Sequence, residues 1–227
     1  LNCVVLKSHG SADAKGVANC VHLCAELIEK DNTRQVTEDL ANFRKDGAAF
    51  ELTIKGRHNR FNARCAVEAC RLMGISEDKI ALGLSTFRNL AHRLEPVRTV
   101  KGVEYINDSK ATNSDAASKS IAALKNIYWL AGGVPKEGGI GGLKPLFSNI
   151  KKAYLFGEAK NLFAQEIGTD INVQICENME EAFFLACADA KLDPIPSNIL
   201  LAPACASYDQ FKDYEERGNQ FIELFSS

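Results

Sequence analysis

The second half of the chain alternates short apolar runs with stretches of helical pattern, and this alternation limits the possible folds more than any other feature. The apolar runs lie at 103–106, 127–131, 152–156, 172–175 and 198–202. The helical stretches lie near 114–124, 158–167, 178–191 and 208–225. Strands that alternate with helices predict a mostly parallel sheet covered on both faces, so we expect an α/β fold here.

The first part of the chain has a different pattern, with helical spacing around one alternating segment. The expected elements are a helix over 16–30, a strand over 48–55, a helix from Asn59 to Met73, and a helix that Ser76 caps and that runs to about Phe87. Because the pattern changes after His92, we place a domain boundary around His92 to Pro96. The expected domains are residues 1–92 and 93–227.

The composition argues against several classes of protein. The chain has 227 residues, of which 46% are hydrophobic and 25% charged, with a formal net charge of −2, as in an ordinary soluble globular protein. No apolar run approaches the roughly 18 residues that a membrane helix requires, and no basic stripe indicates nucleic acid. The eight cysteines include no Cys-x-x-Cys pair, so reduced thiols in a cytosolic protein are expected. The first residues lack Met and match neither a signal peptide nor a transit peptide.

Three of the apolar runs end in a conspicuous polar or glycine-rich turn. NDSKATN begins at Asn107, GGVPKEGG begins at Gly132, and PACAS begins at Pro203. Parallel strands present their carboxyl ends at one edge of a sheet, and ligands bind beyond that edge. We therefore expect all three turns to lie on one rim.

The NDSKATN turn is the most unusual of the three. Thr112, Asn113 and Ser114 are all good helix N-caps, and one of them is expected to cap the following helix. Capping does not explain why Asp108 and Lys110 occur together. A helix N-terminus beside a lysine is a ready anion site, and the aspartate suits a ribose hydroxyl, a cation or an ammonium group. The turn is therefore a candidate site whose ligand stays open.

The remaining motifs argue against several kinds of site and assign no ligand. The glycine-rich stretch 132–142 matches neither G-x-x-x-x-G-K-[ST] nor G-x-G-x-x-G, so it is either a loop over a pocket that carries Lys136 or a plain flexible loop. The four histidines have no zinc-site spacing. No histidine is placed by sequence to activate Cys205 or Ser207, which disfavours a nucleophilic hydrolase.

Three segments, in this order and spacing, resemble the Mur ligases. They are GRHNRFN at 56–62, HRLEPV at 92–97 leading into INDSKATN at 106–113, and PACASYDQFKDYEERG at 203–218. The last two segments are most similar to the members of the family that add D-glutamate. The resemblance runs from about Gly56 to the C-terminus.

The resemblance implies an ATP-driven amide ligation in cytoplasmic peptidoglycan synthesis. ATP would phosphorylate the carboxylate of UDP-N-acetylmuramoyl-L-alanine, and the amine of D-glutamate would attack the acyl phosphate. Family members use Mg²⁺, and a monomer that acts on small molecules, without nucleic acid or membrane, is expected. Residues 1–92 would be the C-terminal part of a central ATP-binding domain, and residues 93–227 a Rossmann-like domain that brings the amino acid.

The resemblance also implies roles for residues of the nucleotide site. Asn59 and Asn62 match a pair that meets adenine, for which amides supply a donor and an acceptor. Arg93 matches a residue that reaches the ATP phosphates, and Asp108 matches a nucleotide contact, expected at the ribose. Lys110 resembles the catalytic cation that steadies charge near the reacting groups.

A second set of residues matches contacts to the amino acid. Thr112 and Lys136 would hold the side-chain carboxylate of D-glutamate. Ser207 and the backbone around Tyr214 would hold its α-carboxylate. The remaining motif residues are interpreted as structural or as core: His58, His92, Glu95 and Phe211.

The chain lacks features that the resemblance leads us to expect. These are a phosphate-binding G-K-[ST] loop, a modified lysine and the Mg²⁺ ligands; only Ala14-Lys15-Gly16 approaches the loop motif. We therefore expect a truncated chain that is inactive alone. Two alternatives stay open. One is another ligase of the superfamily, such as a folylpolyglutamate synthase that prefers L-glutamate, and the other is a non-catalytic module that binds nucleotide or amino acid.

Overall fold

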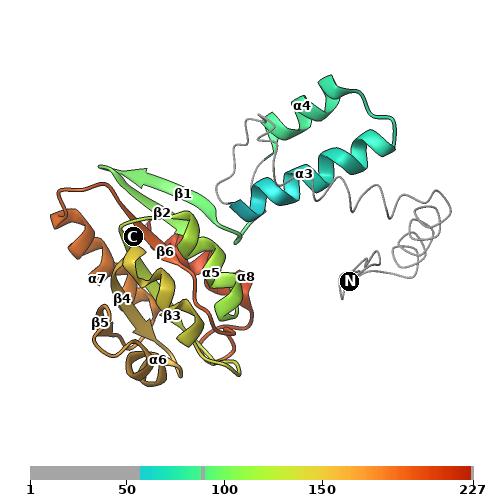
Figure 1. Cartoon of the computed structure of the whole chain (residues 1–227). Helices are drawn as coiled ribbons and strands as arrows, with labels where there is room; N and C mark the ends of the chain where they lie inside the picture. Colours follow the sequence, from blue (N-terminus) through green and yellow to red (C-terminus); the bar gives the residue numbers. More distant parts are fainter. Residues whose placement is uncertain (1–56, 88–89, 226–227) are drawn as a thin grey trace. The chain divides into compact units, whose positions relative to one another are not determined.

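The computed structural model of the chain describes residues 57–87 and 90–225, which belong to one compact unit, Glu51–Ser227. Figure 1 shows the elements of this unit. The helix expected over 16–30 and the strand expected over 48–55 lie outside the described residues.

A mostly parallel sheet forms the centre of the region after His92 (Figure 1). In the described part of the chain it has six strands, in the order β1-β2-β6-β3-β4-β5. Every neighbouring pair is parallel except β1 and β2. The strands are β1 (Glu95–Val100), β2 (Val103–Asn107), β3 (Ile127–Gly132), β4 (Ile150–Phe156), β5 (Asn172–Ile175) and β6 (Ser197–Leu201). The predicted mostly parallel α/β sheet is confirmed.

Each of the five predicted apolar runs forms a strand within two residues of its expected ends. Strand β1 was not predicted, because it is an exposed edge strand without an apolar run. Pro96 fits such a position, since a proline cannot donate a hydrogen bond to a ladder and is tolerated at a sheet edge. The register of β1 shifts between Pro96 and Arg98, which marks a bulge or irregularity.

Helices cover both faces of the sheet. Along β3 the side chains alternate, so that Trp129 and Ala131 join one apolar cluster while Tyr128 and Leu130 join the other. Helices α5 and α6 and the 3-10 helix η1 pack into the first cluster, and helices α7 and α8 pack into the second. Their bounds are α5 (Ser114–Ala123), η1 (Gly141–Asn149), α6 (Lys160–Ile167), α7 (Met179–Leu192) and α8 (Tyr214–Glu223).

The last helix is shorter than its pattern predicts. A helix was expected from 208 to 225, but α8 begins at Tyr214 because Asp213 caps it by accepting a hydrogen bond from the Glu216 amide at 2.8 Å. The Glu216 carboxylate in turn accepts from the Lys212 amide at 2.6 Å. The arrangement resembles a capping box, except that the Glu216 carboxylate accepts from the residue before the N-cap, and it fixes the start of the helix.

Two helices precede the sheet. They are α3 (Arg57–Leu72) and α4 (Glu77–Thr86), each within two residues of its predicted bounds. Ser76 occupies the N-cap position of α4 as predicted, although its side chain makes no capping hydrogen bond. Among the described residues, no helix combines the length and the apolarity needed to cross a lipid bilayer.

Candidate functional site

Three turns at the carboxyl ends of neighbouring strands form one rim of the sheet. NDSKATN follows β2, PACAS follows β6 and GGVPKEGG follows β3, and these strands are adjacent and parallel. Backbone hydrogen bonds join the turns directly. The Ala204 amide donates to the Ala111 carbonyl at 2.9 Å, and Val134 forms an antiparallel bridge with Ala206. The prediction that the three turns share one rim is confirmed.

One buried guanidinium ties the three turns together. Arg217, on α8, is fully buried. Its Nε donates to Ser109 Oγ at 3.0 Å, and Nη2 donates to the carbonyls of Ser109 at 2.9 Å and Cys205 at 3.1 Å. Nη1 donates to the Gly132 carbonyl at 3.5 Å. Burial lowers the pKa of Arg217 to about 10, so the side chain stays charged at neutral pH. The charged side chain of Arg217 therefore holds all three turns of the rim together through hydrogen bonds.

Arg217 was not predicted to have a role, although the residue lies in the third motif. The helical pattern of α8 indicates a helix, but it does not distinguish a buried arginine from an exposed one. The only available signal was an arginine one residue before Gly218 within an otherwise acidic first half of the helix. The burial of Arg217 depends on Ser109, which is 108 positions away in the chain.

The glycine-rich turn after β3 is fixed at both ends. Gly132 and Gly133 have φ angles of 145° and 126°, and a Cβ atom at either would collide with a backbone carbonyl oxygen. Only glycine allows this close approach of the chain. At the far end, the Ile140 amide donates to Glu166 Oε2 at 2.7 Å. Lys136 lies between these two anchored ends with an exposed side chain.

Polar groups of the NDSKATN turn are mostly satisfied within the protein. Asn113 is the N-cap of α5 and accepts from the Ala116 amide at 2.8 Å, which confirms one of the three predicted caps. Ser109 Oγ donates to the Tyr214 carbonyl at 2.7 Å. The turn therefore has a defined geometry that does not depend on a ligand.

Buried polar contacts also hold the segment before β1. The His92 and Leu94 φ angles are 61° and 45°, in the left-handed region that L-residues rarely adopt. The Asn107 side-chain Nδ2 donates to His92 Nδ1 at 2.9 Å, and the His92 backbone amide donates to Glu95 Oε2 at 2.9 Å. The Leu94 amide donates to Asp108 Oδ1 at 3.1 Å. His92 and Glu95 therefore have structural roles, as predicted, and they fix the backbone on both sides of Arg93.

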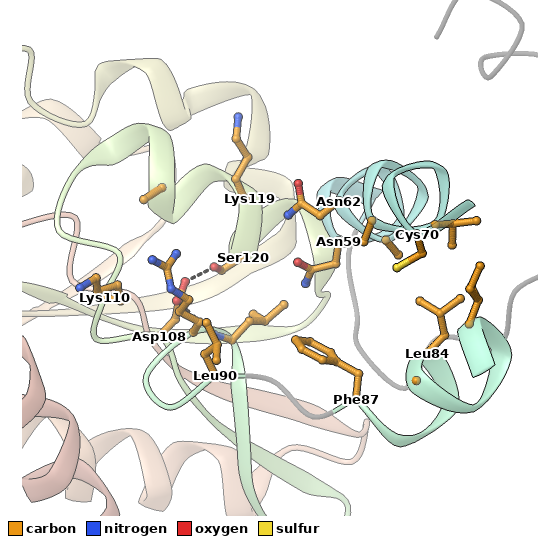
Figure 2. A pocket seen from close by; sticks show the side chains of 18 of the residues that line it. Asn59, Asn62, Cys70, Leu84, Phe87, Leu90, Asp108, Lys110, Lys119 and Ser120 are labelled. Atoms are coloured by element: carbon orange, nitrogen blue, oxygen red, sulfur yellow. Dashed lines mark hydrogen bonds between the residues drawn. The ribbon is translucent and has the colours of Figure 1, made fainter. Parts of the chain in front are cut away.

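Asp108 is an almost fully buried carboxylate, with 7% of its surface exposed. One of its oxygens accepts a hydrogen bond from Ser120 Oγ on α5 (Figure 2). The other accepts from the Leu94 backbone amide. Burial raises the pKa of Asp108 to about 6, while the bonds from Ser120 and Leu94 and the nearby charge of Arg93 oppose that increase. Asp108 is therefore ionised at neutral pH by only a narrow margin.

A cavity of about 690 Å³ lies beside Asp108. Residues of α3, α4, the segment before β1, the NDSKATN turn and α5 line it (Figure 2). All five residues expected to act on nucleotide or charge line this cavity: Asn59, Asn62, Arg93, Asp108 and Lys110. The structure thus brings together all the residues that were predicted to contact the nucleotide or to stabilise charge, although they come from three separate segments of the sequence.

The charge in the cavity favours an anion. Its described lining residues include four cations, which are Lys79, Arg93, Lys110 and Lys119, and a single acid, Asp108. Lys119 and Ser120 were not predicted to lie in a site, because both fall within the helical pattern of α5, where such residues usually face solvent. Lys119 forms an exposed ion pair with Asp115 at 3.0 Å.

The four residues expected to hold the amino acid do not line this cavity. Thr112 is half-buried, Lys136 is exposed, Ser207 is 2% exposed, and Tyr214 is the first residue of α8. All four lie on the rim turns or at the start of the helix that carries Arg217. The two sets meet at Lys110, whose Nζ lies 3.6 Å from the centroid of the Tyr214 ring, in cation–π contact.

The metal-ligating side chains and thiols of the described residues do not form a second reactive site. Within residues 57–87 and 90–225, no three His, Cys, Asp or Glu side chains form a group that could hold a metal ion. The cysteines in the described part of the chain are all free thiols: Cys65, Cys70, Cys176, Cys187 and Cys205. Burial raises the pKa of Cys205 to about 12, so its thiol is inert despite its place on the rim.

Comparison with known proteins connects the site to one family. A family model described as "Mur ligase, glutamate ligase domain" matches residues 92–205. UDP-N-acetylmuramoylalanine–D-glutamate ligase of Rickettsia conorii is 45% identical over 199 residues, which cover 85% of this chain and 40% of the relative. The ligase of the same name from Agrobacterium fabrum is 46% identical over 171 residues, which cover 75% of this chain and 36% of the relative. The chain thus spans less than half the length of these curated relatives.

Solved structures show the same fold at low sequence identity. UDP-N-acetylmuramate-alanine ligase MurC of Thermotoga maritima matches with a TM-score of 0.56 and 14% identity, over 77% of this chain and 39% of that one. MurF of Acinetobacter baumannii matches with a TM-score of 0.52 and 18% identity, over 78% of this chain and 39% of that one.

Proposed function

Because the chain belongs to the Mur ligase family, we propose that it carries the amino-acid-adding part of an ATP-dependent ligase that joins D-glutamate to UDP-N-acetylmuramoyl-L-alanine. The similarity to D-glutamate ligases over most of the chain carries this proposal. In the reaction, the muramoyl-alanine carboxylate is phosphorylated by ATP, the D-glutamate amine attacks the acyl phosphate, and phosphate leaves as the amide forms. This step belongs to peptidoglycan synthesis in the cytoplasm, and we propose a monomer as the acting form.

The cofactors of the proposed reaction follow from the family. Mur ligases depend on ATP and generally on Mg²⁺. The described residues offer no group of acidic, histidine or cysteine side chains for a metal ion, so no Mg²⁺ ligand is assigned to them.

The cavity is proposed to take the nucleotide. Asn59 and Asn62 offer amide donors and acceptors that suit the edge of adenine. Arg93 is exposed on the cavity wall, where its guanidinium can pair with phosphate oxygens. Asp108 offers a carboxylate acceptor for ribose hydroxyls. An excess of cations around a single acid supports a polyanionic ligand of this kind.

The rim is proposed to take the amino acid. Thr112 and Lys136 would bind the side-chain carboxylate of D-glutamate, and Ser207 with the backbone at Tyr214 would bind the α-carboxylate. Arg217 supports the proposed amino-acid site, because it fixes the three turns that carry the site residues. It also adds a buried positive charge to the region that would receive a dicarboxylate. A fixed rim lowers the entropy lost when the amino acid is positioned for attack.

Lys110 is proposed to act where the two ligands meet. It lines the nucleotide cavity, and it also contacts Tyr214 on the amino-acid side. An ammonium group here can stabilise negative charge that develops on the acyl phosphate and on the tetrahedral intermediate. We further propose the domain division given by the sequence, with residues 1–92 as part of the central ATP-binding domain and 93–227 as the amino-acid-binding domain.

A chimera tests the proposed function. The matching segment of the Rickettsia conorii ligase is replaced by this chain, and phosphate release is measured with ATP, Mg²⁺ and UDP-N-acetylmuramoyl-L-alanine, with either D- or L-glutamate. We expect release that depends on D-glutamate and is close to background with L-glutamate. The unmodified Rickettsia protein is the positive control, and circular dichroism verifies that the chimera folds.

Two results would contradict the proposal. A folded chimera that prefers L-glutamate would favour a ligase of the folylpolyglutamate synthase type. A folded chimera that binds ATP and D-glutamate without turnover would favour a non-catalytic binding module.

A further inference from the structure

One buried hydroxyl donates to the Asp108 carboxylate on the wall of the cavity. Ser120 is 2% exposed and lies on α5, and its Oγ donates to Asp108 Oδ2 (Figure 2). The other oxygen of Asp108 accepts from the Leu94 amide. Both Ser120 and Asp108 line the cavity, so the pair lies between the core of the domain and the space that receives a ligand.

We propose that Ser120 is a positioning residue that holds the Asp108 side chain as an ionised, correctly oriented acceptor for the hydroxyl groups of the nucleotide. This inference rests on the proposed function in one respect, which is the identity of the cavity ligand as a nucleotide. The contact between Ser120 and Asp108 lies entirely within the sheet domain and does not depend on that assignment.

The physical argument starts from the burial of Asp108. Burial alone disfavours the charged form, and the pKa of Asp108 at about 6 lies close to neutral pH. The Ser120 hydroxyl and the Leu94 amide donate to the ionised form and so lower that pKa. If the Ser120 bond is lost, the pKa rises towards the working pH. A protonated carboxyl then donates where a ribose hydroxyl needs an acceptor.

Neighbouring charges cannot substitute for this bond. The charged groups that line the cavity around Asp108 come from four segments: Arg93 from the segment before β1, Lys110 from the NDSKATN turn, Lys119 from α5 and Lys79 from α4. Of these, Arg93 acts on the pKa of Asp108 through its charge. The cations are also the groups that a polyphosphate would neutralise on binding. Ser120 keeps its effect in the loaded site because it is neutral and buried.

The first experiment measures the pKa of the Asp108 carboxyl group. In the 227-residue chain, the Asp108 carboxyl carbon is followed by ¹³C NMR from pH 4 to 9. We expect a midpoint near 6 in the wild type and a midpoint about one pH unit higher in Ser120→Ala, because one of two donors to the carboxylate is gone. Ser118→Ala is the matched control, since that hydroxyl lies on the same helix and donates only to the Asp115 carbonyl.

A second variant keeps the core packed. Ser120→Cys keeps a hydrogen-bond donor at the same position in a somewhat larger side chain, but its thiol is a weaker donor. We expect it to fold like the wild type and to titrate between the wild type and Ser120→Ala. An Asp108 midpoint that is the same in the wild type and both Ser120 variants would overturn the proposal.

The second experiment separates positioning from a general structural role. In the chimera described above, the KM for ATP of Ser120→Ala is compared with that of the parent chimera at pH 6.5 and pH 8.5. We expect KM to rise by about threefold at pH 6.5, where a midpoint one pH unit higher leaves about a third as many molecules with an ionised Asp108, and to return close to the parent value at pH 8.5, where Asp108 is ionised again. An equal loss at both pH values would overturn the proposal, because simple damage to the fold would give that pattern.

Failure of this inference is distinguishable from failure of the proposed function. A parent chimera without D-glutamate-dependent turnover would reject the proposed function, while the NMR titration would still decide the role of Ser120. An active chimera with an unchanged Asp108 midpoint in Ser120→Ala would reject only the role of Ser120.

Discussion

The rim and the cavity are each built around one buried charge, and the two charges differ in how securely they are held. Arg217 fixes the rim, and its pKa of about 10 leaves it charged at any physiological pH. Asp108 lies at the cavity, and its pKa of about 6 leaves only a small margin at neutral pH. Burial favours the neutral form in both cases, but it starts from a reference pKa far above neutral for arginine and below neutral for aspartate. The charge of the cavity should therefore change with pH near neutrality, whereas the charge of Arg217 at the rim should stay constant.

The partners of the two charges also differ. Arg217 donates to neutral oxygens of three turns, so its removal leaves several acceptors without a donor. Asp108 accepts from one backbone amide and one hydroxyl, so its neutral analogue can keep much of the same arrangement. Loss of the buried cation should therefore damage the fold, whereas neutralisation of the buried anion should damage only function.

The largest effect is expected from Arg217→Met. This change removes every side-chain donor that joins the three turns, and we expect the free energy of unfolding to fall by about 3 kcal/mol or more, with loss of D-glutamate-dependent turnover. Urea unfolding of the chain and activity of the chimera measure the two effects. Arg217→Lys keeps the charge but not the geometry of the guanidinium, so an intermediate loss is expected. A stable Met variant would show that the rim does not depend on this side chain.

Asp108→Asn should have the opposite effect on stability. Between about pH 4 and pH 6 the folded chain holds more protons at Asp108 than the unfolded chain, so wild-type stability falls as pH rises through this range. The variant lacks this penalty, and we expect it to be more stable than wild type at pH 8, by up to about 3 kcal/mol, and nearly equal below pH 4. Urea unfolding at the two pH values gives the comparison.

A control and a functional measurement complete this test. Asp115→Asn, on the exposed face of α5, should change stability little at either pH. Asp108→Asn should lose ATP affinity in the chimera in spite of its greater stability. A variant that is less stable at pH 8 than the wild type would contradict the assignment of Asp108 as a buried group ionised against its burial.

Gly218→Ala tests the segment that leads into the cavity. A Cβ atom at this position would collide with His92 Nδ1, which accepts from Asn107. We expect a loss of about 1–3 kcal/mol in the free energy of unfolding, since the methyl group overpacks a buried contact. Arg93 follows His92 directly, so the KM for ATP should rise more than the KM for D-glutamate. Equal changes in both constants would argue that α8 supports the rim and the cavity alike.

The smallest effect on stability is expected from Lys136→Ala. Because the side chain is exposed, the free energy of unfolding should change by less than about 0.5 kcal/mol. The KM for D-glutamate in the chimera should nevertheless rise by about tenfold or more, which is typical for the loss of a charge-assisted hydrogen bond. The KM for ATP should stay constant, and an unchanged KM for D-glutamate would remove Lys136 from the proposed site.

Much of the fold and part of the site follow from local patterns. The five predicted strands and the four α-helices that accompany them appear as apolar runs and helical periodicity, and Asn113 is recognisable as a cap from its position before an alanine-rich helix. The shared rim follows from topology, since the carboxyl ends of parallel strands lie at one edge. The edge strand β1 escaped prediction because its exposed residues follow no apolar pattern.

The sequence by itself determined the order of five of the strands and of the α-helices after them, the turns that carry polar residues, and the motifs that indicate a Mur ligase. Only the tertiary structure decided which charges are buried and what they contact. Ser120 donates a hydrogen bond to Asp108, although nothing in the helical pattern of α5 sets Ser120 apart from its neighbours. Arg217 donates a hydrogen bond to Ser109, which is 108 positions away in the chain. Periodicity is a local property that neighbouring residues encode, whereas desolvation and hydrogen bonding depend on groups that only long-range packing brings together.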